Sequence, residues 1–449
     1  MHKTRDSFGS KFGAIAALAG SAVGLGNIWK FPYEAGSNGG GAFLIVYICF
    51  TLLLGFPVML SEFALGRKGQ RNAFGTFKVL APGTKWHYFG ILSIVAAAFI
   101  LSFYGTVSGW TLEYVWLSMT NSFEGQNAES ISTLFNDFIT HPYRAVLWQL
   151  GFMFLTGAII LAGVKNGIER YTKMMMPILF VIIILLCIRA CTLDGAGEGL
   201  KFLFYPDFSA LTGDAILSAL GQAFFSLSLG MGVLLTYASY INKKEDLANI
   251  SLQVIITDSL VAILAGIAIL PAVFAFNIDP QAGPGLVFLA LPQVFESMPF
   301  GYIWAILFFV LLTFAALTSA ISLLEVVVAY LVEEKKMSRL KATIVTTLGI
   351  GALGALCTLS FGPLRHIQIF GLSIFDTFDF ISSNILLPAG GILICIFAGW
   401  RLDKKILYNE ISNEGTLKLK MFRVYIFILK YIAPICILLI LLNVLGIVK

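Results

Sequence analysis

Two apolar segments of the chain each contain a Gly-x-Gly motif beside small polar residues. The first reads Gly24-Leu25-Gly26-Asn27, and the second reads Ser228-Leu229-Gly230-Met231-Gly232. Glycine lowers the stability of a helix by about 1 kcal/mol, so two glycines close together favour local unwinding. Unwound carbonyls are suitable ligands for a cation, and the amino termini of half-helices attract an anion. Each motif could therefore hold part of a small ionic ligand.

The elements that would position these motifs are membrane-spanning helices. Of the 449 residues, 58% are hydrophobic and only 12% are charged. So few polar side chains cannot coat a water-facing surface, which excludes a soluble enzyme, a disordered chain and a fibrous repeat. About eleven apolar segments are long enough to span a membrane. They cover residues 12–37, 42–66, 88–118, 145–163, 173–192, 215–240, 248–276, 301–332, 342–359, 371–400 and 424–447.

The two motifs fall in the first and sixth segments, which occupy equivalent positions if the first ten segments form two five-helix halves. Interrupted helices at matching positions of two halves indicate a substrate site near the middle of a transporter. For either motif alone, close helix packing through small residues is the simpler interpretation. The correspondence between the motifs, with Asn27 and Ser228 beside them, favours the binding site. An amino acid carboxylate beside a sodium ion would suit both features of the broken helices. The sodium ion would bind the unwound carbonyls, and the carboxylate would lie at a half-helix amino terminus.

The distribution of basic residues predicts the orientation of the chain. With the N-terminus in the cytoplasm, 23 of the 30 Lys and Arg residues fall in inner loops and five on the outside. This excess agrees with the positive-inside rule. Because the number of spans is odd, we expect a cytoplasmic N-terminus and an extracytoplasmic C-terminus.

Two other classes of membrane protein fit the sequence less well. A channel requires a continuous polar or charged pore lining, which the segments lack. A membrane enzyme is not indicated, because the sequence has no HExxH, GxSxG or phosphate-loop motif. The four histidines all lie at segment ends or in loops. We therefore expect neither enzyme activity nor a nucleic-acid partner.

At these motifs the chain resembles the neurotransmitter:sodium symporter family, in its bacterial amino acid transporter branch. The resemblance covers essentially the whole chain and is most specific at residues 20–32, 38–43, 221–230 and 317–319. It implies an all-α membrane protein of about 11 transmembrane helices, with a 5+5 inverted repeat and broken helices 1 and 6. It further implies a multi-pass protein of the bacterial plasma membrane. We expect one transporter domain over 1–449, with a first repeat at about 10–192, a second at about 212–400 and an extra helix at about 421–447.

The resemblance implies a sodium-coupled symporter that imports a hydrophobic, and even an aromatic, L-amino acid by alternating access. Its partners would be the amino acid, sodium ions and the lipid bilayer. The alternative is a sodium- or proton-coupled transporter of an amine or an osmolyte. Amine-transporting relatives have an Asp in the first segment that pairs with the substrate ammonium, whereas this chain has Gly24 there. An α-amino acid, whose carboxylate can lie beside sodium, is therefore favoured.

The resemblance also implies two sodium sites built from oxygen ligands, which suit a hard cation. The first would use the carbonyl of Ala22 and the side chains of Asn27, Ser226 and Asp258, completed by the substrate carboxylate. The second would use the carbonyls of Gly20, Val23 and Ala315 with the hydroxyls of Thr318 and Ser319.

Asp258 departs from the family pattern, because an Asn is usual at this position. Ala262, one turn later, replaces a residue that is Ser in chloride-dependent members. A carboxylate inside a membrane is costly and indicates a functional site. We hypothesise that Asp258, near Tyr47, Gln222 and Ser226, supplies a negative charge in place of chloride, so that chloride is not required. It could also ligate sodium or exchange a proton. The alternative is a solvated residue near the cytoplasmic end of the helix.

The resemblance predicts a substrate pocket that is apolar except at one end. Its residues would be Ser21, Ala22, Leu25, Gly26, Ile100, Tyr104, Phe225, Ser226, Ser228, Met231, Ser319 and Leu323. Tyr104 would bind the carboxylate, and Phe225 would cover the pocket. Met231 stands where the bacterial leucine transporter has Phe, and a pliable methionine leaves room for a larger aromatic substrate.

Two gates are expected by the same resemblance. The outer gate would pair Lys30 with Asp379, and Lys binds a carboxylate as a point charge, more loosely than the Arg often found there. The inner gate would be formed by Arg5, Phe8, Tyr240 and Glu333. For Glu333 the alternative is an ordinary solvated helix end. Gly167 and Pro177 match the family's Gly-x9-Pro motif and would allow the fifth segment to unwind.

Overall fold

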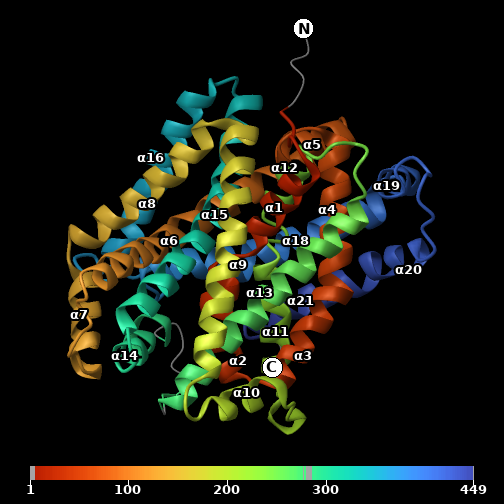
Figure 1. Cartoon of the computed structure of the whole chain (residues 1–449). Helices are drawn as coiled ribbons and strands as arrows, with labels where there is room; N and C mark the ends of the chain where they lie inside the picture. The colour runs from red at the N-terminus through yellow and green to blue at the C-terminus, as the bar shows by residue number, and fades with distance from the viewer. Residues whose placement is uncertain (1–5, 277, 280–285, 448–449) are drawn as a thin grey trace.

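The structure is a computed structural model that describes residues 6–276, 278–279 and 286–447. Within these residues the regular structure is helical throughout, as predicted (Figure 1). Nine helices in this part of the chain are long and apolar enough to cross a membrane. They are Gly41–Gly69, His87–Met119, Arg144–Leu161, Val164–Cys191, Leu247–Ala275, Gly301–Glu333, Arg339–Leu359, Ile374–Arg401 and Phe422–Val444.

The remaining two predicted spans are interrupted, and several others contain a π-helical turn. The α-helices of the spans are α1 (Lys11–Ala22), α2 (Phe31–Ser37), α3 (Gly41–Phe50), α4 (Phe56–Gly69), α6 (His87–Met119), α8 (Arg144–Leu161), α9 (Arg170–Cys191), α11 (Gly213–Ser226), α12 (Val233–Ala238), α13 (Leu247–Ala275), α15 (Gly301–Glu333), α16 (Arg339–Leu359), α17 (Ile374–Asp379), α18 (Leu387–Ile396), α20 (Phe422–Phe427) and α21 (Ala433–Val444). The π-helical turns are η1 (Gly26–Lys30), η2 (Thr51–Gly55), η3 (Val164–Glu169), η6 (Leu286–Ala290), η7 (Phe380–Leu386), η8 (Phe397–Arg401) and η9 (Ile428–Ile432).

The first span is broken at the first glycine motif, as predicted. Helix α1 ends at Ala22, and the backbone of Val23 is extended. The chain resumes as a helix at Gly26, and the two halves of the span meet at an angle of 47°. Pro32 lies within the continuous half-helix Gly26–Ser37, where its missing N–H removes one hydrogen bond to a carbonyl of the preceding turn.

The sixth span is broken at the second glycine motif. Helix α11 ends at Ser226 and α12 begins at Val233. Ser228, Gly230 and Gly232 between them all have positive φ angles, of 55°, 79° and 76°. Only glycine adopts that conformation without strain, which explains two of the three residues. Figure 1 shows α1 and α12 toward one end of the molecule and α2 and α11 toward the other, so the two broken spans run in opposite directions.

Long unbroken helices hold the broken spans in place. Helix α15 packs against α6, α9 and α1, and α13 packs against α1, α2 and α9. Small residues of α15 are buried along this surface, including Ala315, Ala316 and Ala320. Such residues let helix backbones approach closely in a membrane. The middle of the molecule is therefore built to position the two breaks.

The structure differs from the expected spans in two respects. The fifth span begins at Val164, nine residues before the predicted boundary of 173. Lys165, Glu169 and Arg170 interrupt the apolar pattern there, although the helix continues through them. Short helices in the loops were also not predicted, because their apolar faces are brief. They are α5 (Ala73–Leu80), α7 (Ala128–Thr140), α10 (Ala196–Phe204), η4 (Phe208–Ala210), α14 (Leu291–Glu296) and α19 (Lys404–Ile411).

Candidate binding site between the two broken helices

A small cavity of about 30 Å³ lies between the two breaks. Its lining combines an apolar body with a few polar groups, which is typical of small-molecule sites. The lining residues are Ala22, Gly24, Leu25, Gly26, Ile100, Tyr104, Phe225, Ser226, Ser228, Met231, Ser319 and Leu323. Eleven of the twelve residues predicted for the pocket are therefore brought together here. Ser21 is not among the lining residues, but its carbonyl accepts a hydrogen bond from Ser228 at 3.0 Å.

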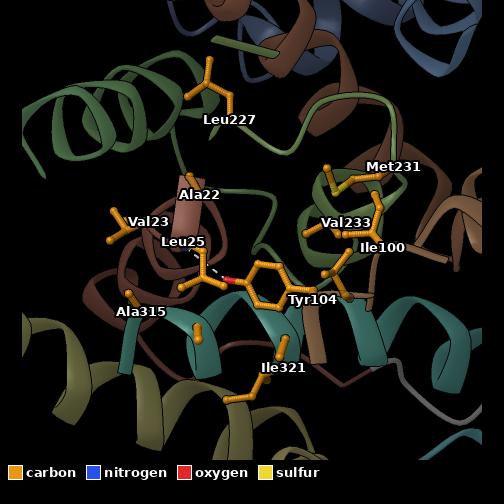
Figure 2. Packing of buried hydrophobic residues seen from close by; sticks show 14 of the residues in the cluster. Ala22, Val23, Leu25, Ile100, Tyr104, Leu227, Met231, Val233, Ala315 and Ile321 are labelled. Atoms are coloured by element: carbon orange, nitrogen blue, oxygen red, sulfur yellow. Dashed lines mark hydrogen bonds between the residues drawn. The ribbon is translucent and has the colours of Figure 1, made fainter. Parts of the chain in front are cut away.

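Tyr104 marks the polar end of the cavity. Its hydroxyl accepts a hydrogen bond from the Leu25 backbone N–H at 3.2 Å. Figure 2 shows this hydroxyl pointing to the break of the first span, while Ile100, Met231 and Val233 gather near the other end of the ring. A Cβ atom at Gly24 would lie 3.0 Å from the Tyr104 hydroxyl and 2.3 Å from Ser319 Oγ. Glycine is therefore required at this position for the cavity to keep its shape.

Asp258 lies at the centre of a buried polar cluster that joins four spans. Its Oδ1 atom accepts hydrogen bonds from Ser226 Oγ at 2.7 Å and from Asn27 Nδ2 at 2.8 Å. Its Oδ2 atom accepts one from the Tyr47 hydroxyl at 3.0 Å. The side chain is fully buried, so the alternative of a solvated carboxylate is wrong. Within the described residues no basic side chain forms an ion pair with Asp258.

The backbone at the first break is fixed by two side-chain amides. Asn27 Oδ1 accepts a hydrogen bond from the Gly24 N–H at 3.0 Å. Gln222 Nε2 donates to the Gly26 carbonyl at 2.6 Å. The cluster around Asp258 thus offers carboxylate, hydroxyl and amide oxygens next to unwound backbone. This donor set fits a hard monovalent cation.

A second group of oxygen atoms lies between the first break and α15. Thr318 Oγ1 donates hydrogen bonds to the Val23 carbonyl at 3.2 Å and to the Ala315 carbonyl at 3.0 Å. Ser319 Oγ lies 3.4 Å from the same Val23 carbonyl. A Cβ atom at Gly20 would lie 3.4 Å from Thr318 Cβ, so this glycine also borders the group. All five residues predicted for the second sodium site are therefore neighbours.

The two residues predicted for the outer gate make other contacts in this structure. Lys30 Nζ lies 4.7 Å from the centroid of the Phe225 ring, over the ring face. Asp379 accepts a hydrogen bond from Ser383 at 2.7 Å. No ion pair joins Lys30 to Asp379, both of which the structure describes. The lysine therefore contacts an aromatic ring that lines the cavity between the two breaks.

The residues predicted for the inner gate are partly brought together. The Phe8 N–H donates to the Tyr240 carbonyl at 3.1 Å, and the two rings meet edge to face. Glu333 Oε2 accepts hydrogen bonds from the backbone and side-chain nitrogens of Asn72, each at 2.9 Å. Glu333 thus caps the loop before α5, which argues against a merely solvated helix end. Arg5 lies outside the described residues.

Sequence reasoning missed two buried carboxylates near the breaks. Glu62 Oε1 accepts a hydrogen bond from the Gly230 N–H at 2.8 Å and so fixes the second break. Glu325 forms an ion pair with Arg339 at 2.7 Å and accepts a hydrogen bond from the Tyr240 hydroxyl, also at 2.7 Å. Both are fully buried. An acidic residue within an apolar span was the signal that could have found them.

The fifth span carries a third missed carboxylate at its first turn. Glu169 accepts hydrogen bonds from the Gly9 N–H at 2.5 Å and from Ser10 Oγ at 2.9 Å, and it pairs with Lys173. The span is helical through both Gly167 and Pro177, with Gly167 in the π-helical turn η3. The N-terminal arm is therefore attached to the segment that the sequence predicts to unwind.

Comparisons with known proteins place this geometry among membrane transporters. The model of the sodium:neurotransmitter symporter family matches residues 5–137 and 134–449. The uncharacterized sodium-dependent transporter YhdH of Bacillus subtilis is 42% identical over 440 residues, 98% of this chain and 98% of that protein. An uncharacterized sodium-dependent transporter of Haemophilus influenzae is 36% identical over 450 residues, again 98% of each chain.

A solved structure resembles the whole fold. The crystal structure of MhsT in complex with L-phenylalanine matches with a TM-score of 0.91 and 45% sequence identity, over 98% of this chain and 100% of that chain. This match confirms the predicted five-plus-five inverted repeat with two broken helices. The separation of the repeats near residues 192 and 212, and the treatment of 1–449 as one domain, stay predictions.

Proposed function

This chain belongs to the sodium:neurotransmitter symporter family, and we propose that it imports a large hydrophobic L-amino acid together with sodium. Membership makes the protein a multi-pass, sodium-dependent membrane transporter and not an enzyme. The substrate, the two ion sites and the direction of transport are the parts that the proposal adds. The observation that carries them is the cavity between the two breaks, with its polar end at Tyr104 and its apolar body.

The polar end of the cavity suits the zwitterionic part of an amino acid. The Tyr104 hydroxyl, held by the Leu25 N–H, would donate to the substrate carboxylate. Gly24 provides no acidic side chain to bind an amine that lacks a carboxylate. A carboxylate beside the first sodium ion would also lie near the N-terminal end of η1, where helix dipoles favour negative charge. An α-amino acid therefore fits better than a biogenic amine.

The apolar lining of the cavity suits a hydrophobic side chain, and the cavity would widen to admit a large one. Ile100, Met231 and Leu323 line it, and the Phe225 ring covers it. Methionine changes shape readily, so Met231 can adapt to an aromatic ring. MhsT, which shares 45% of its residues with this chain, was crystallised with L-phenylalanine. We therefore place aromatic and large aliphatic amino acids first among the substrates.

Sodium would couple to the substrate through the Asp258 cluster. The Ala22 carbonyl, Asn27, Ser226 and Asp258 would supply oxygen ligands, and the substrate carboxylate would complete the set. Asn27 would present its oxygen to the ion by a flip of its amide, whose nitrogen now faces Asp258, and would give up the hydrogen bond that its Oδ1 accepts from the Gly24 N–H. Because Asp258 already provides a negative charge, chloride is not needed to balance the ion.

A second sodium ion would link the first break to α15. The carbonyls of Gly20, Val23 and Ala315 and the hydroxyls of Thr318 and Ser319 are its proposed ligands. Binding there would hold α1 against α15 and keep the inner side closed. Unwinding of the fifth span at Gly167 would then admit water and release the ion inward. The gates at Lys30 with Asp379, and at Arg5, Tyr240 and Glu333, would close alternately around the cavity.

The orientation of the chain in the membrane determines which side the substrate would enter from. The excess of basic residues in one set of loops supports a cytoplasmic N-terminus and an external C-terminus, and we propose a bacterial plasma membrane as the location. In this orientation the inward sodium gradient drives uptake.

The direct test is a binding panel with the purified protein. All twenty L-amino acids, and a biogenic amine as a comparison, compete for the site in sodium and in potassium. We expect sodium-dependent binding of aromatic and large aliphatic amino acids, and no binding of the amine. Absence of sodium-dependent binding by any amino acid would overturn the proposal.

A further inference from the structure

Lys430 is a charged residue inside the last membrane span. The span runs from Phe422 to Val444 and has a mean hydropathy of 2.5 in its most apolar window. Lys430 lies on the π-helical turn η9, about two turns from the start of the span. A charged side chain at membrane depth is costly, so its environment requires a physical explanation.

The ammonium group of Lys430 lies against an aromatic residue of the tenth span. Its Nζ atom is 4.5 Å from the centroid of the Trp400 ring. Trp400 Nε1 donates a hydrogen bond to the Lys430 carbonyl at 3.4 Å. Gly399 permits this approach, because a Cβ atom there would lie 2.9 Å from Lys430 Cγ. Trp400 lies on η8, so the two spans meet at a π-helical turn on each side, and such turns are frequent at functional sites.

In the part of the chain that the structure describes, the positive charge at this contact lacks an acidic partner. Within the described residues no carboxylate forms an ion pair with Lys430. Three other basic residues of the membrane spans each pair with an acidic residue, namely Arg144 with Glu113, Lys173 with Glu169 and Arg339 with Glu325. The Trp400 ring alone contributes only about 0.5–1 kcal/mol to an exposed cation. The site is therefore electrostatically incomplete.

The missing anion would come from the membrane side. Trp400 is 56% exposed and Tyr431, whose ring centroid lies 5.5 Å from that of Trp400, is 44% exposed. Arg401, the next residue after Trp400, is exposed as well. Tryptophan and tyrosine concentrate at the headgroup level of a bilayer, and basic pockets between spans bind anionic headgroups. Trp400 and Tyr431 beside Lys430 are aromatic residues of this kind, and Lys430 with Arg401 supplies basic charge between the two spans.

We propose that Lys430, Trp400 and Arg401 bind the phosphate headgroup of an anionic phospholipid between the tenth and eleventh spans. The lysine and arginine would contact the phosphate, while the two aromatic rings would contact the glycerol and upper acyl chain. Phe397, on the same turn η8, packs against Phe77 of the loop helix α5 with ring centroids 4.8 Å apart. A lipid bound here would stabilise the junction of the last two spans next to that loop helix.

The test measures lipid binding to the purified full chain by native mass spectrometry. Palmitoyl-oleoyl phosphatidylglycerol, the matching phosphatidylcholine and inorganic phosphate are titrated separately. We expect phosphatidylglycerol to bind at least fivefold more tightly than phosphatidylcholine, and inorganic phosphate at millimolar concentration neither to bind nor to displace the lipid. About fivefold is the contribution expected from one basic residue near an anionic headgroup. If inorganic phosphate at millimolar concentration displaced the bound phosphatidylglycerol, the assignment of a lipid to this site would be overturned.

Variants locate the site. Lys430→Gln and Arg401→Gln should each reduce the preference for phosphatidylglycerol by about fivefold, whereas Lys430→Arg should retain it. Lys418→Gln, which removes a charge from an exposed loop position, is the matched control and should behave like the wild type. Arg401 is exposed, so its variant tests the site even if Lys430→Gln fails to fold. An unchanged lipid preference in Arg401→Gln, or an equal loss in Lys418→Gln, would contradict the proposal.

Discussion

Asn27 donates a hydrogen bond of 2.8 Å to Asp258, and this contact joins the break of the first span to the middle of the seventh. The carboxylate that receives it is fully buried and has no basic partner among the described residues. A buried negative charge of this kind is stable only if a cation or a proton balances it. The proposed sodium ion would supply that balance, and the cluster would then link ion binding to the shape of the cavity between the two breaks.

The first prediction concerns chloride. Wild-type uptake should be equal in sodium chloride and in sodium gluconate, because Asp258 supplies the negative charge. The variant Asp258→Asn keeps the shape of the side chain but removes its charge. Its uptake in gluconate should be at least tenfold below that of the wild type, and chloride should restore part of it. Uptake of labelled amino acid into proteoliposomes checks both statements. Loss of wild-type uptake in the absence of chloride would show that Asp258 does not replace the anion.

The second prediction concerns the proposed second sodium site. Thr318→Ala removes the hydroxyl that lies 3.2 Å from the Val23 carbonyl, so half-maximal binding should need about tenfold more sodium. Thr318→Ser keeps the hydroxyl and should stay near the wild-type value. Thr313→Ala, on the same helix but bonded to Phe309 and Thr111, is the control. The measurement is a sodium titration of substrate binding, and an equal shift in the control would contradict the assignment.

The third prediction concerns the polar end of the cavity. Tyr104→Phe removes the acceptor of the Leu25 N–H and the proposed donor to the substrate carboxylate. A lost hydrogen bond to a charged group, here the substrate carboxylate, costs about 1–3 kcal/mol, so substrate affinity should fall roughly 5- to 150-fold. Equilibrium binding at saturating sodium measures this loss. Wild-type affinity in Tyr104→Phe would exclude Tyr104 from the site.

The fourth prediction concerns Gly24. A Cβ atom there would lie 2.3 Å from Ser319 Oγ, so Gly24→Ala should reduce uptake more than tenfold by deforming the cavity. Gly221→Ala is a matched control, because a Cβ atom at Gly221 has no heavy atom within 4 Å. Uptake is compared at equal amounts of protein in the membrane. If both variants transported like the wild type, the cavity in this structure would not be the transport site.

Much of the fold could be predicted from the sequence because membrane helices follow from local composition. Apolar length predicted the approximate positions of the nine described helices that are long enough to cross a membrane, and the glycine motifs located both breaks. The start of the fifth span was misplaced because Lys165, Glu169 and Arg170 lower the local hydropathy without ending the helix. The short loop helices have too few apolar residues to give a clear periodic signal.

The site was less accessible to sequence reasoning because its contacts join distant segments. The motifs identified residues that do share one cavity, among them Tyr104 and Met231. They could not reveal that Tyr240 binds Glu325, or that Lys30 lies over Phe225 and makes no ion pair with Asp379. Such choices depend on which partner is nearest in the folded state. A systematic survey of acidic residues inside apolar spans would have found Glu62 and Glu325.

The most direct test of the account is concentrative uptake. Proteoliposomes that contain the purified chain receive the labelled amino acid that binds best, under an inward sodium gradient. We predict accumulation above the external concentration, which a sodium ionophore abolishes and which Asp258→Asn reduces. Equilibration of the amino acid to the external concentration, regardless of the sodium gradient, would contradict sodium-coupled amino acid import.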